Sequence, residues 1–226
     1  DCPSDYPLQK KRHTLEYLRT LPHLRMRTNT LGAVFRLRSL CSFAIHRFFM
    51  ERGFVYVHTP ILTARDCEGA GALFSVNAQE PGAHAKAVEA NEFFGKPASL
   101  TVSGQLDAEA FALAYKKAYT FGPTFRAERS NTPRHAAEFW MVEPEMAFAD
   151  LKDDMDLAES LIKYLIDDAL KAAHSEITFF DRFIENGLIE RLQRILNAEF
   201  ERVEYARAVS ILIKSGRSFE YPVEWG

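Results

Sequence analysis

The chain has 226 residues, of which 47% are hydrophobic and 26% are charged, and this composition excludes a disordered tail and a small disulfide-stapled domain. A core of this size buries roughly 70% of the surface that the unfolded chain exposes, so neither a metal nor a disulfide is needed for stability. The net charge of −3 excludes a protein whose whole surface binds nucleic acid, although a local basic patch remains compatible with it.

Charge is unevenly distributed along the chain. Nine basic and three acidic residues give residues 1–47 a net charge of +6, and the other 179 residues carry −9. A basic end on an acidic body suits contact with a phosphate backbone, where each neutralised phosphate releases counterions. A solvated helix face explains this single feature equally well.

The cysteines and the hydropathy pattern bear on the compartment. Cys2, Cys41 and Cys67 are odd in number and show no Cys-x-x-Cys spacing, so they indicate a reducing compartment rather than a disulfide framework or a zinc site. No apolar run approaches the ~18 to 20 residues that cross a bilayer. We therefore predict a cytoplasmic protein with no membrane partner.

The first strongly patterned unit lies in residues 31–60. Apolar side chains recur at three and four over residues 31–52 and predict a helix, which ends at Gly53 because glycine tolerates a left-handed backbone. Residues 54–59 are aromatic and β-branched and predict a strand that ends at Pro60. Residues 77–92 lack periodicity and are interpreted as a surface insertion.

The rest of the chain changes from strand patterns to helix patterns. A short polar loop joins residues 118–128 to residues 138–148, so these two predicted strands should pair in the antiparallel sense. Strands that come first and helices that come later indicate an α+β fold. The elements predicted after the insertion are strands at 98–102, 118–128 and 138–148 and helices at 105–117, 154–173, 180–197 and 203–214.

Alternation along the two long strands separates charged groups from the large apolar ones. Arg126 and Glu128 fall on one face of the first strand, and Glu143 and Glu145 share a face of the second. Buried charges are costly unless they are paired or contact a ligand. These residues form either a buried salt-bridge network between Arg126 and Glu143 or Glu128, or a binding site, and we favour the binding site.

The connecting loop, residues 129–135, contains two arginines and a histidine and could close over a polyphosphate, because a planar guanidinium donates two hydrogen bonds at once. With the strands that flank it, residues 122–145, it resembles motif 2 of class II aminoacyl-tRNA synthetases. The resemblance is to the subgroup of aspartyl, asparaginyl and lysyl enzymes, and it extends from about residue 6 to residue 226.

Three further segments carry the same resemblance in the order that the family shows. The unit of helix, Gly53, strand and Pro60 resembles motif 1, which forms the dimer interface in that class. Residues 59–71 are similar to the flipping loop of the subgroup, and residues 101–106 to its amino-acid-pocket segment. A homodimer is therefore expected.

The resemblance implies roles for the residues of the ATP site. Arg126 matches the catalytic arginine that bridges the amino-acid carboxylate and the α-phosphate of ATP, where negative charge builds up. Glu128 matches the residue that reads the adenine amino group, and Phe139 the ring that stacks under adenine. Arg134 and His135 match positions near the β- and γ-phosphates.

The resemblance also implies an amino-acid site. Glu68 matches the flipping-loop glutamate that holds the α-ammonium group, Ser103 and Gln105 match residues that line the pocket, and Glu143 faces the substrate. Aspartyl enzymes have a lysine where this chain has Ala108, and an aspartate where it has Glu143. The loss of a cation and the longer acid both disfavour an anionic substrate side chain, so asparagine is preferred to aspartate.

The implied fold is α+β, a class II synthetase-type antiparallel sheet flanked by helices and incomplete at the C-terminus. Residues 1–12 would be the hinge after a missing anticodon-binding OB-fold domain. Residues 13–226 would be a partial catalytic domain that has motifs 1 and 2 but lacks motif 3. The ligands of Mg²⁺ are accordingly expected beyond residue 226, with no metal site inside the chain.

The implied activity is the activation of L-asparagine with ATP and Mg²⁺ to asparaginyl-adenylate and its transfer to tRNA(Asn). One alternative is a synthetase-derived asparagine synthetase, which would pass the adenylate to ammonia. Another is a non-catalytic synthetase-like binding module. Arg129, Pro133 and Ala136 differ from the usual motif 2 loop of the family.

Overall fold

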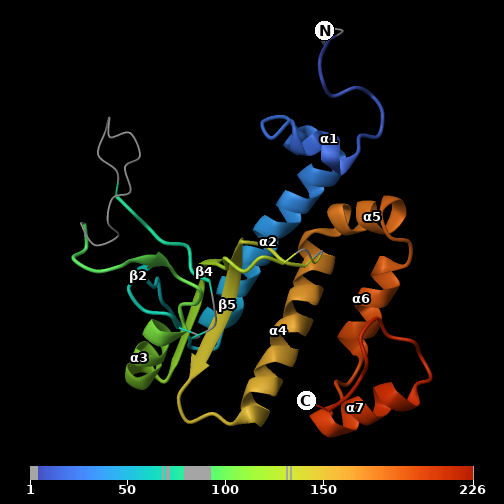
Figure 1. Cartoon of the computed structure of the whole chain (residues 1–226). Coiled ribbons are helices and arrows are strands. Elements are labelled where there is room, and N and C mark those ends of the chain that lie inside the picture. Colours follow the sequence, from blue (N-terminus) through green and yellow to red (C-terminus); the bar gives the residue numbers. More distant parts are fainter. Residues whose placement is uncertain are drawn as a thin grey trace.

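The computed structural model describes residues 5–67, 69, 72–78, 93–130, 132 and 134–225. The helices in this part of the chain are α1 (Leu15–Arg19), η1 (Arg25–Arg27), α2 (Asn29–Glu51), α3 (Gln105–Tyr115), α4 (Leu151–Ala172), α5 (His174–Phe183), α6 (Leu188–Asn197) and α7 (Tyr205–Lys214). The strands are β1 (Val55–Tyr56), β2 (Leu62–Thr63), β3 (Ser99–Leu100), β4 (Lys117–Phe125) and β5 (Glu138–Met146). Figure 1 shows the long helices α2 and α4 beside the β4 and β5 strands.

The main sheet has the strand order β1, β4, β5. β4 and β5 are antiparallel from the pair Lys117 and Met146 to the pair Phe125 and Glu138, which confirms the predicted hairpin. β1 adds a short parallel edge, with Val55 opposite Ala118. β2 and β3 form a separate antiparallel pair. The structure therefore confirms a mixed fold in which small sheets are flanked by helices.

The aromatic face of β4 packs on α2. Phe48, Phe49 and Tyr119 are fully buried, and they form one cluster with Ile45 and Phe121. The rings of Phe49 and Tyr119 stack with their centroids 4.5 Å apart. This burial of large apolar side chains is the main stabilising contribution to the fold.

The ends of α2 follow from local sequence. Thr28 precedes the helix, and its hydroxyl accepts a hydrogen bond from the Leu31 N–H at 3.4 Å, as a helix N-cap does. Gly53 has a φ of +76° and ends the helix, as its place in the sequence predicts. The helix begins two residues earlier than predicted, because the capping threonine lies before the apolar repeat.

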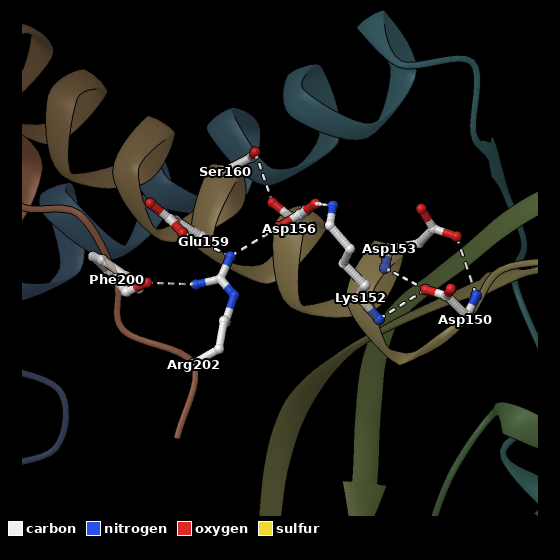
Figure 2. A network of polar contacts seen from close by, with 8 residues as sticks. All are labelled: Asp150, Lys152, Asp153, Asp156, Glu159, Ser160, Phe200 and Arg202. Carbon is white, nitrogen blue, oxygen red and sulfur yellow. Dashed lines mark hydrogen bonds and ion pairs between the residues drawn. The ribbon is translucent and has the colours of Figure 1, made fainter. Parts of the chain in front are cut away.

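α4 covers the same side of the sheet as α2. Asp150 forms a capping box with Asp153 at its start, and Figure 2 shows both side chains turned toward the backbone of the first turn. Arg47 on α2 donates to the Tyr164 hydroxyl at 2.7 Å and to Asp168 Oδ1 at 2.5 Å. These contacts hold the two long helices side by side.

Arg202 joins the segment before α7 to α4 through ion pairs. Arg202 Nη2 lies 2.9 Å from Asp156 Oδ1 and 2.8 Å from Glu159 Oε2, and Nη1 donates to the Phe200 carbonyl at 3.2 Å. Figure 2 shows the guanidinium between these groups, with Lys152 on the other side of Asp156. The two acidic side chains thus orient the chain between α6 and α7.

The predicted helix over residues 180–197 is wrong. α5 ends at Phe183, and α6 begins at Leu188 after Gly187, which has a φ of +84°. A left-handed residue cannot continue a right-handed helix, and Asp181 caps the new one by accepting the Ile189 N–H at 3.0 Å. The apolar repeat on both sides of the break made the two helices look like one.

The four predicted strands are shorter in the structure than their patterns suggested. Residues 54–59 form a strand only at Val55–Tyr56, and residues 98–102 only at Ser99–Leu100. The two long strands end before residues 126 and 147. Residues 79–92 of the predicted insertion lie outside the described residues. No helix in the described ranges combines the length and the apolar character needed to cross a membrane.

The other face of the sheet is covered by α3 near Ala118. Ala112 on α3 packs with Ala118 and with Val57 after β1, and the small side chains let the helix approach closely. Glu145, opposite Ala118 in the register, lies near Glu109 of α3. Burial raises the pKa of Glu145, and the neighbouring charges of Glu109, Glu143 and Asp154 raise it further.

Replacement of Phe49 tests the importance of the aromatic cluster. Because this side chain is fully buried against Phe48, Phe54 and Tyr119, Phe49→Ala should lower the free energy of unfolding by about 3–5 kcal/mol. Leu113→Ala, at a side chain that is 82% exposed, is the control and should change it by less than about 0.5 kcal/mol. Urea unfolding followed by circular dichroism measures both, and equal effects would contradict the assignment of the core.

The raised pKa of Glu145 predicts a pH dependence of stability. The folded state holds this proton more tightly than the unfolded state, so stability should fall as pH rises from the ordinary value of 4.5 through the raised pKa. Glu145→Gln removes the titration and should be more stable than the wild type at pH 7, with a gain that shrinks toward pH 4. Urea unfolding across this range measures the gain. Glu224→Gln, at an exposed site, should follow the wild type, and a parallel pH profile for both variants would refute the prediction.

Candidate active site

The site lies on the α3 side of β4 and β5, beyond the part of that face that α3 covers near Ala118. In the register, Thr120 stands opposite Glu143 and Thr124 opposite Phe139, and paired residues of antiparallel strands share a face. The predicted alternation of faces is therefore confirmed for the residues inside the strands. Arg126 follows the last strand pair and donates its backbone N–H to the Ala137 carbonyl at 3.0 Å, so it stands at the base of the connecting loop.

Glu143 is held by three uncharged donors. The Ser103 hydroxyl donates to Oε1, the Thr120 hydroxyl donates to Oε2 at 2.9 Å, and the Gly104 N–H donates to Oε2 at 3.3 Å. The structure thus brings the predicted site residues Ser103 and Glu143 together. The sequence left open an ion pair between Arg126 and Glu143, and the contacts described for Glu143 come from these uncharged donors.

Residues 101–105 make a tight turn that presents these donors. The Thr101 hydroxyl donates to the Ser103 carbonyl at 2.5 Å and accepts the Ser103 N–H at 3.2 Å. The Ser103 oxygen in turn accepts the Gln105 N–H at 3.0 Å at the start of α3. A Cβ on Gly104 would lie 2.6 Å from Thr59 Oγ1, a distance that requires glycine at this close approach.

The side chain of Gln105 points elsewhere. Its Nε2 donates to Glu109 Oε1 at 3.1 Å, one turn further along α3, and the side chain is exposed. In this conformation it does not contact Ser103 or Glu143. The prediction that it lines the amino-acid pocket therefore stays a prediction.

A cavity of about 240 Å³ borders Glu143. Its walls include hydroxyl groups from three segments that are far apart in the sequence, namely Thr59, Thr101 and Thr120. The sequence patterns did not identify these threonines as site residues. For Thr120 a signal was available, because the alternation of faces places it beside Glu143.

The loop after β4 contains the predicted phosphate-binding residues. The His135 N–H donates to the Thr132 carbonyl at 3.2 Å, and His135 Nε2 lies 3.1 Å from the Glu128 carbonyl oxygen. Arg134 and His135 are exposed, whereas Arg126, Glu128 and Phe139 are half-buried. Glu128 Oε2 is buried and has no hydrogen-bond partner in the described part of the chain, which leaves an acceptor for a ligand.

Some predicted positions yield no geometry for the site. Glu68 and Pro133 lie outside the described residues. Gly53 ends α2, and Pro60 is exposed beyond β1. Across the described ranges, three or more His, Cys, Asp or Glu side chains never come together in a way that could hold a metal ion. The site residues thus supply hydrogen-bonding and charged groups, and we assign none of them to Mg²⁺.

Comparison with curated proteins finds close relatives along nearly the whole chain. A protein named asparagine–tRNA ligase from Clostridium novyi (strain NT) is 59% identical over 228 residues, which cover 99% of this chain and 49% of that protein. The protein of the same name from Desulfitobacterium hafniense (strain Y51) is 57% identical and covers 100% of this chain and 50% of its own length. The chain therefore spans about half the length of the curated relatives that it matches.

Solved structures give the same result for the fold. The asparaginyl-tRNA synthetase from Pyrococcus horikoshii, complexed with asparaginyl-adenylate, aligns with a TM-score of 0.75 at 30% identity over 92% of this chain and 43% of that chain. A putative aspartyl-tRNA synthetase from Leishmania major Friedlin aligns with a TM-score of 0.61 at 24% identity, over 79% of this chain and 31% of its own, and this likeness concerns the fold alone.

A family model settles the family to which these similarities point. The model described as "tRNA synthetases class II (D, K and N)" matches residues 14–222. The match includes the two long strands, the loop between them and the turn that holds Glu143. This chain belongs to the class II tRNA synthetases of the D, K and N group.

Proposed function

We propose that this chain forms the amino-acid and ATP site of an asparagine–tRNA ligase, which makes asparaginyl-adenylate and transfers asparagine to tRNA(Asn). The observation that carries the proposal is the Glu143 carboxylate, which accepts hydrogen bonds from uncharged donors beside a cavity. Its charge attracts N–H groups and repels a second carboxylate. This preference supports asparagine over aspartate, as do the names of the closely similar relatives.

The first step of the reaction joins asparagine to ATP. The asparagine carboxylate attacks the α-phosphorus, the bond to the bridging oxygen breaks, and pyrophosphate leaves. We assign the Arg126 guanidinium to the oxygens on which charge accumulates, because a preorganised cation is most effective there. Its position at the base of the loop, next to the strand that ends at Phe125, supports this role.

We assign Phe139 and Glu128 to the adenine ring and the loop residues to the remaining phosphates. The half-buried Phe139 ring offers a surface on which a base can stack. The buried Oε2 of Glu128 offers an acceptor for the adenine amino group. Arg134 and His135 are exposed on the loop, where they are free to approach the β- and γ-phosphates. Mg²⁺ would add charge neutralisation at those phosphates.

In the amino-acid site, we assign Glu143 and Ser103 to the substrate N–H groups and Glu68 and Gln105 to the α-ammonium end. Residue 108 is an alanine, which is fully buried on α3. Because its side chain has no charge, this position offers no cation for a substrate carboxylate. The missing cation supports the choice of asparagine.

The second step needs a tRNA, and we propose that the basic N-terminal region binds it. We also propose that the protein acts in the cytoplasm. Lys10, Lys11 and Arg12 are exposed and form no ion pair with any residue in the described ranges. Cations of this kind suit contact with tRNA phosphates.

We further propose that the protein is a homodimer that uses the outer face of α2. Phe35, Phe43 and Met50 lie on the side of the helix opposite the core and are exposed, and β1 adds Val55 and Tyr56 next to them in the chain. An apolar surface on both the helix and its neighbouring strand suits an isologous interface. This apolar surface includes the region around the predicted interface residues Gly53 and Pro60.

The proposed function is tested with the full-length protein by ATP–pyrophosphate exchange. Asparagine should support exchange, and aspartate should support it at least about 100-fold less well, because Glu143 repels its carboxylate. The complete reaction should then attach asparagine to tRNA(Asn). Exchange with aspartate in place of asparagine would contradict the proposal, and tRNA-independent formation of asparagine from aspartate and ammonia would support the synthetase alternative instead.

Arginine variants are the internal controls of the exchange assay. Arg126→Ala should reduce exchange by about 100-fold or more, since it removes the cation at the reacting phosphate. Arg182→Ala replaces an exposed arginine of α5 and should leave the rate unchanged. Equal losses in both variants would remove Arg126 from the reaction centre.

The dimer is tested by a charge on the outer face of α2. Phe43, which is 72% exposed, would be buried in the interface, so Phe43→Glu should weaken association by roughly 100-fold or more. Leu113→Glu, at an even more exposed site on α3, should not. Sedimentation velocity across a concentration series measures both, and an unchanged dimer in Phe43→Glu would place the interface elsewhere.

A further inference from the structure

The three donors to Glu143 do not use all the acceptor positions of its carboxylate. A carboxylate offers about four acceptor positions, and Ser103, Gly104 and Thr120 occupy three of them. Glu143 forms no ion pair within the described part of the chain. These three contacts orient the side chain without neutralising it, and they leave about one of its acceptor positions for a ligand.

Thr120 is the donor that the strand pairing itself supplies. It stands directly opposite Glu143 in the register, and its side chain is 3% exposed. Because both residues sit inside the hydrogen-bonded ladder, the distance between them is set by the backbone. Ser103 and Gly104 reach the same carboxylate from a turn outside the sheet.

The surroundings of Thr120 also restrict its rotation. A Cβ placed on Gly104 would lie 3.0 Å from Thr120 Cγ2 and 3.2 Å from its Oγ1, so the turn packs closely on this side chain. Both branches of the Thr120 side chain therefore lie against the turn, and the hydroxyl also donates to Glu143. Thr120 borders the cavity that Thr59 and Glu143 also line.

We propose that Thr120 is a positioning residue that fixes the Glu143 carboxylate and so determines selection of a substrate with an uncharged, N–H-bearing side chain. This inference rests on the proposed function and adds a residue to its specificity. With the hydroxyl in place, Glu143 presents its free acceptor position to the cavity. Without it, Oε2 of Glu143 keeps only the longer hydrogen bond from the Gly104 N–H at 3.3 Å, and the carboxylate is no longer held in one orientation.

The test compares two substitutions of Thr120 in the full-length protein. Thr120→Val removes the hydroxyl at nearly the same volume, and Thr120→Ser keeps it. Thr120→Val should raise the KM for asparagine in ATP–pyrophosphate exchange by roughly 10-fold, the factor expected for one hydrogen bond to a charged group. In Thr120→Val, the KM for ATP should stay within about twofold of the wild-type value, and the ratio of asparagine to aspartate activity should fall. Thr120→Ser should keep the wild-type KM for asparagine and the wild-type ratio.

A neighbouring threonine provides the matched control. Thr124 lies two residues further along β4, is 2% exposed and donates to the Phe139 carbonyl at 3.3 Å. Thr124→Val therefore removes a buried hydroxyl from the same strand without touching Glu143, and the ratio of asparagine to aspartate activity should not change. A merely structural effect of losing a buried hydroxyl would appear in both variants.

Crystal structures of the wild type and of Thr120→Val give a readout that does not depend on activity. The Glu143 carboxylate should rotate away from its wild-type position in Thr120→Val. Suppose that the wild type is active with asparagine. An unmoved carboxylate in Thr120→Val, or a selectivity ratio equal to that of the wild type, would then overturn the inference and leave the proposed function intact. A wild type without asparagine-dependent exchange would overturn the proposed function itself.

Discussion

The antiparallel pairing of β4 with β5 is the constraint on which the rest of the structure depends. Within it, Thr120 faces Glu143 while the next pair, Phe121 and Val142, faces the core. Because side chains alternate with a period of two, a slip of one residue would exchange the two faces. Glu143 would then meet the aromatic side chains of α2. The apolar core therefore fixes the register, and the register fixes the carboxylate of the site.

Residue size separates the two faces of the sheet as clearly as polarity does. The α2 side is filled by large rings such as Phe49 and Tyr119, whereas the α3 side has Ala112 and Ala118. These small residues, together with Gly104, allow the first turn of α3 to approach β4. The close approach is what brings the Gly104 N–H to Glu143, so small side chains here contribute to the site as well as to packing.

The sequence predicts those features of the fold and the site that local patterns determine. Alternation predicted which residues of β4 and β5 share a face, and Gly53 predicted the end of α2. The break at Gly187 was visible as an Asn-Gly turn signal, but the apolar repeat across it was given more weight. The short strands around β1 and the donors to Glu143 depend on contacts between distant segments. Strand pairing places Thr120 opposite Glu143, whereas Ser103 and Gly104 reach it only because residues 101–105 fold over the sheet.

In the proposed function, the uncharged donors around Glu143 contribute both to the stability of the site and to its selectivity. An arginine at this place would form a bidentate pair, fill the acceptor positions and cancel the charge. Hydroxyl and amide donors orient the half-buried carboxylate without cancelling its charge. The same contacts, from Ser103, Gly104 and Thr120, join α3 to β4 and orient the carboxylate. In this proposal, folding and substrate selection depend on one small set of hydrogen bonds.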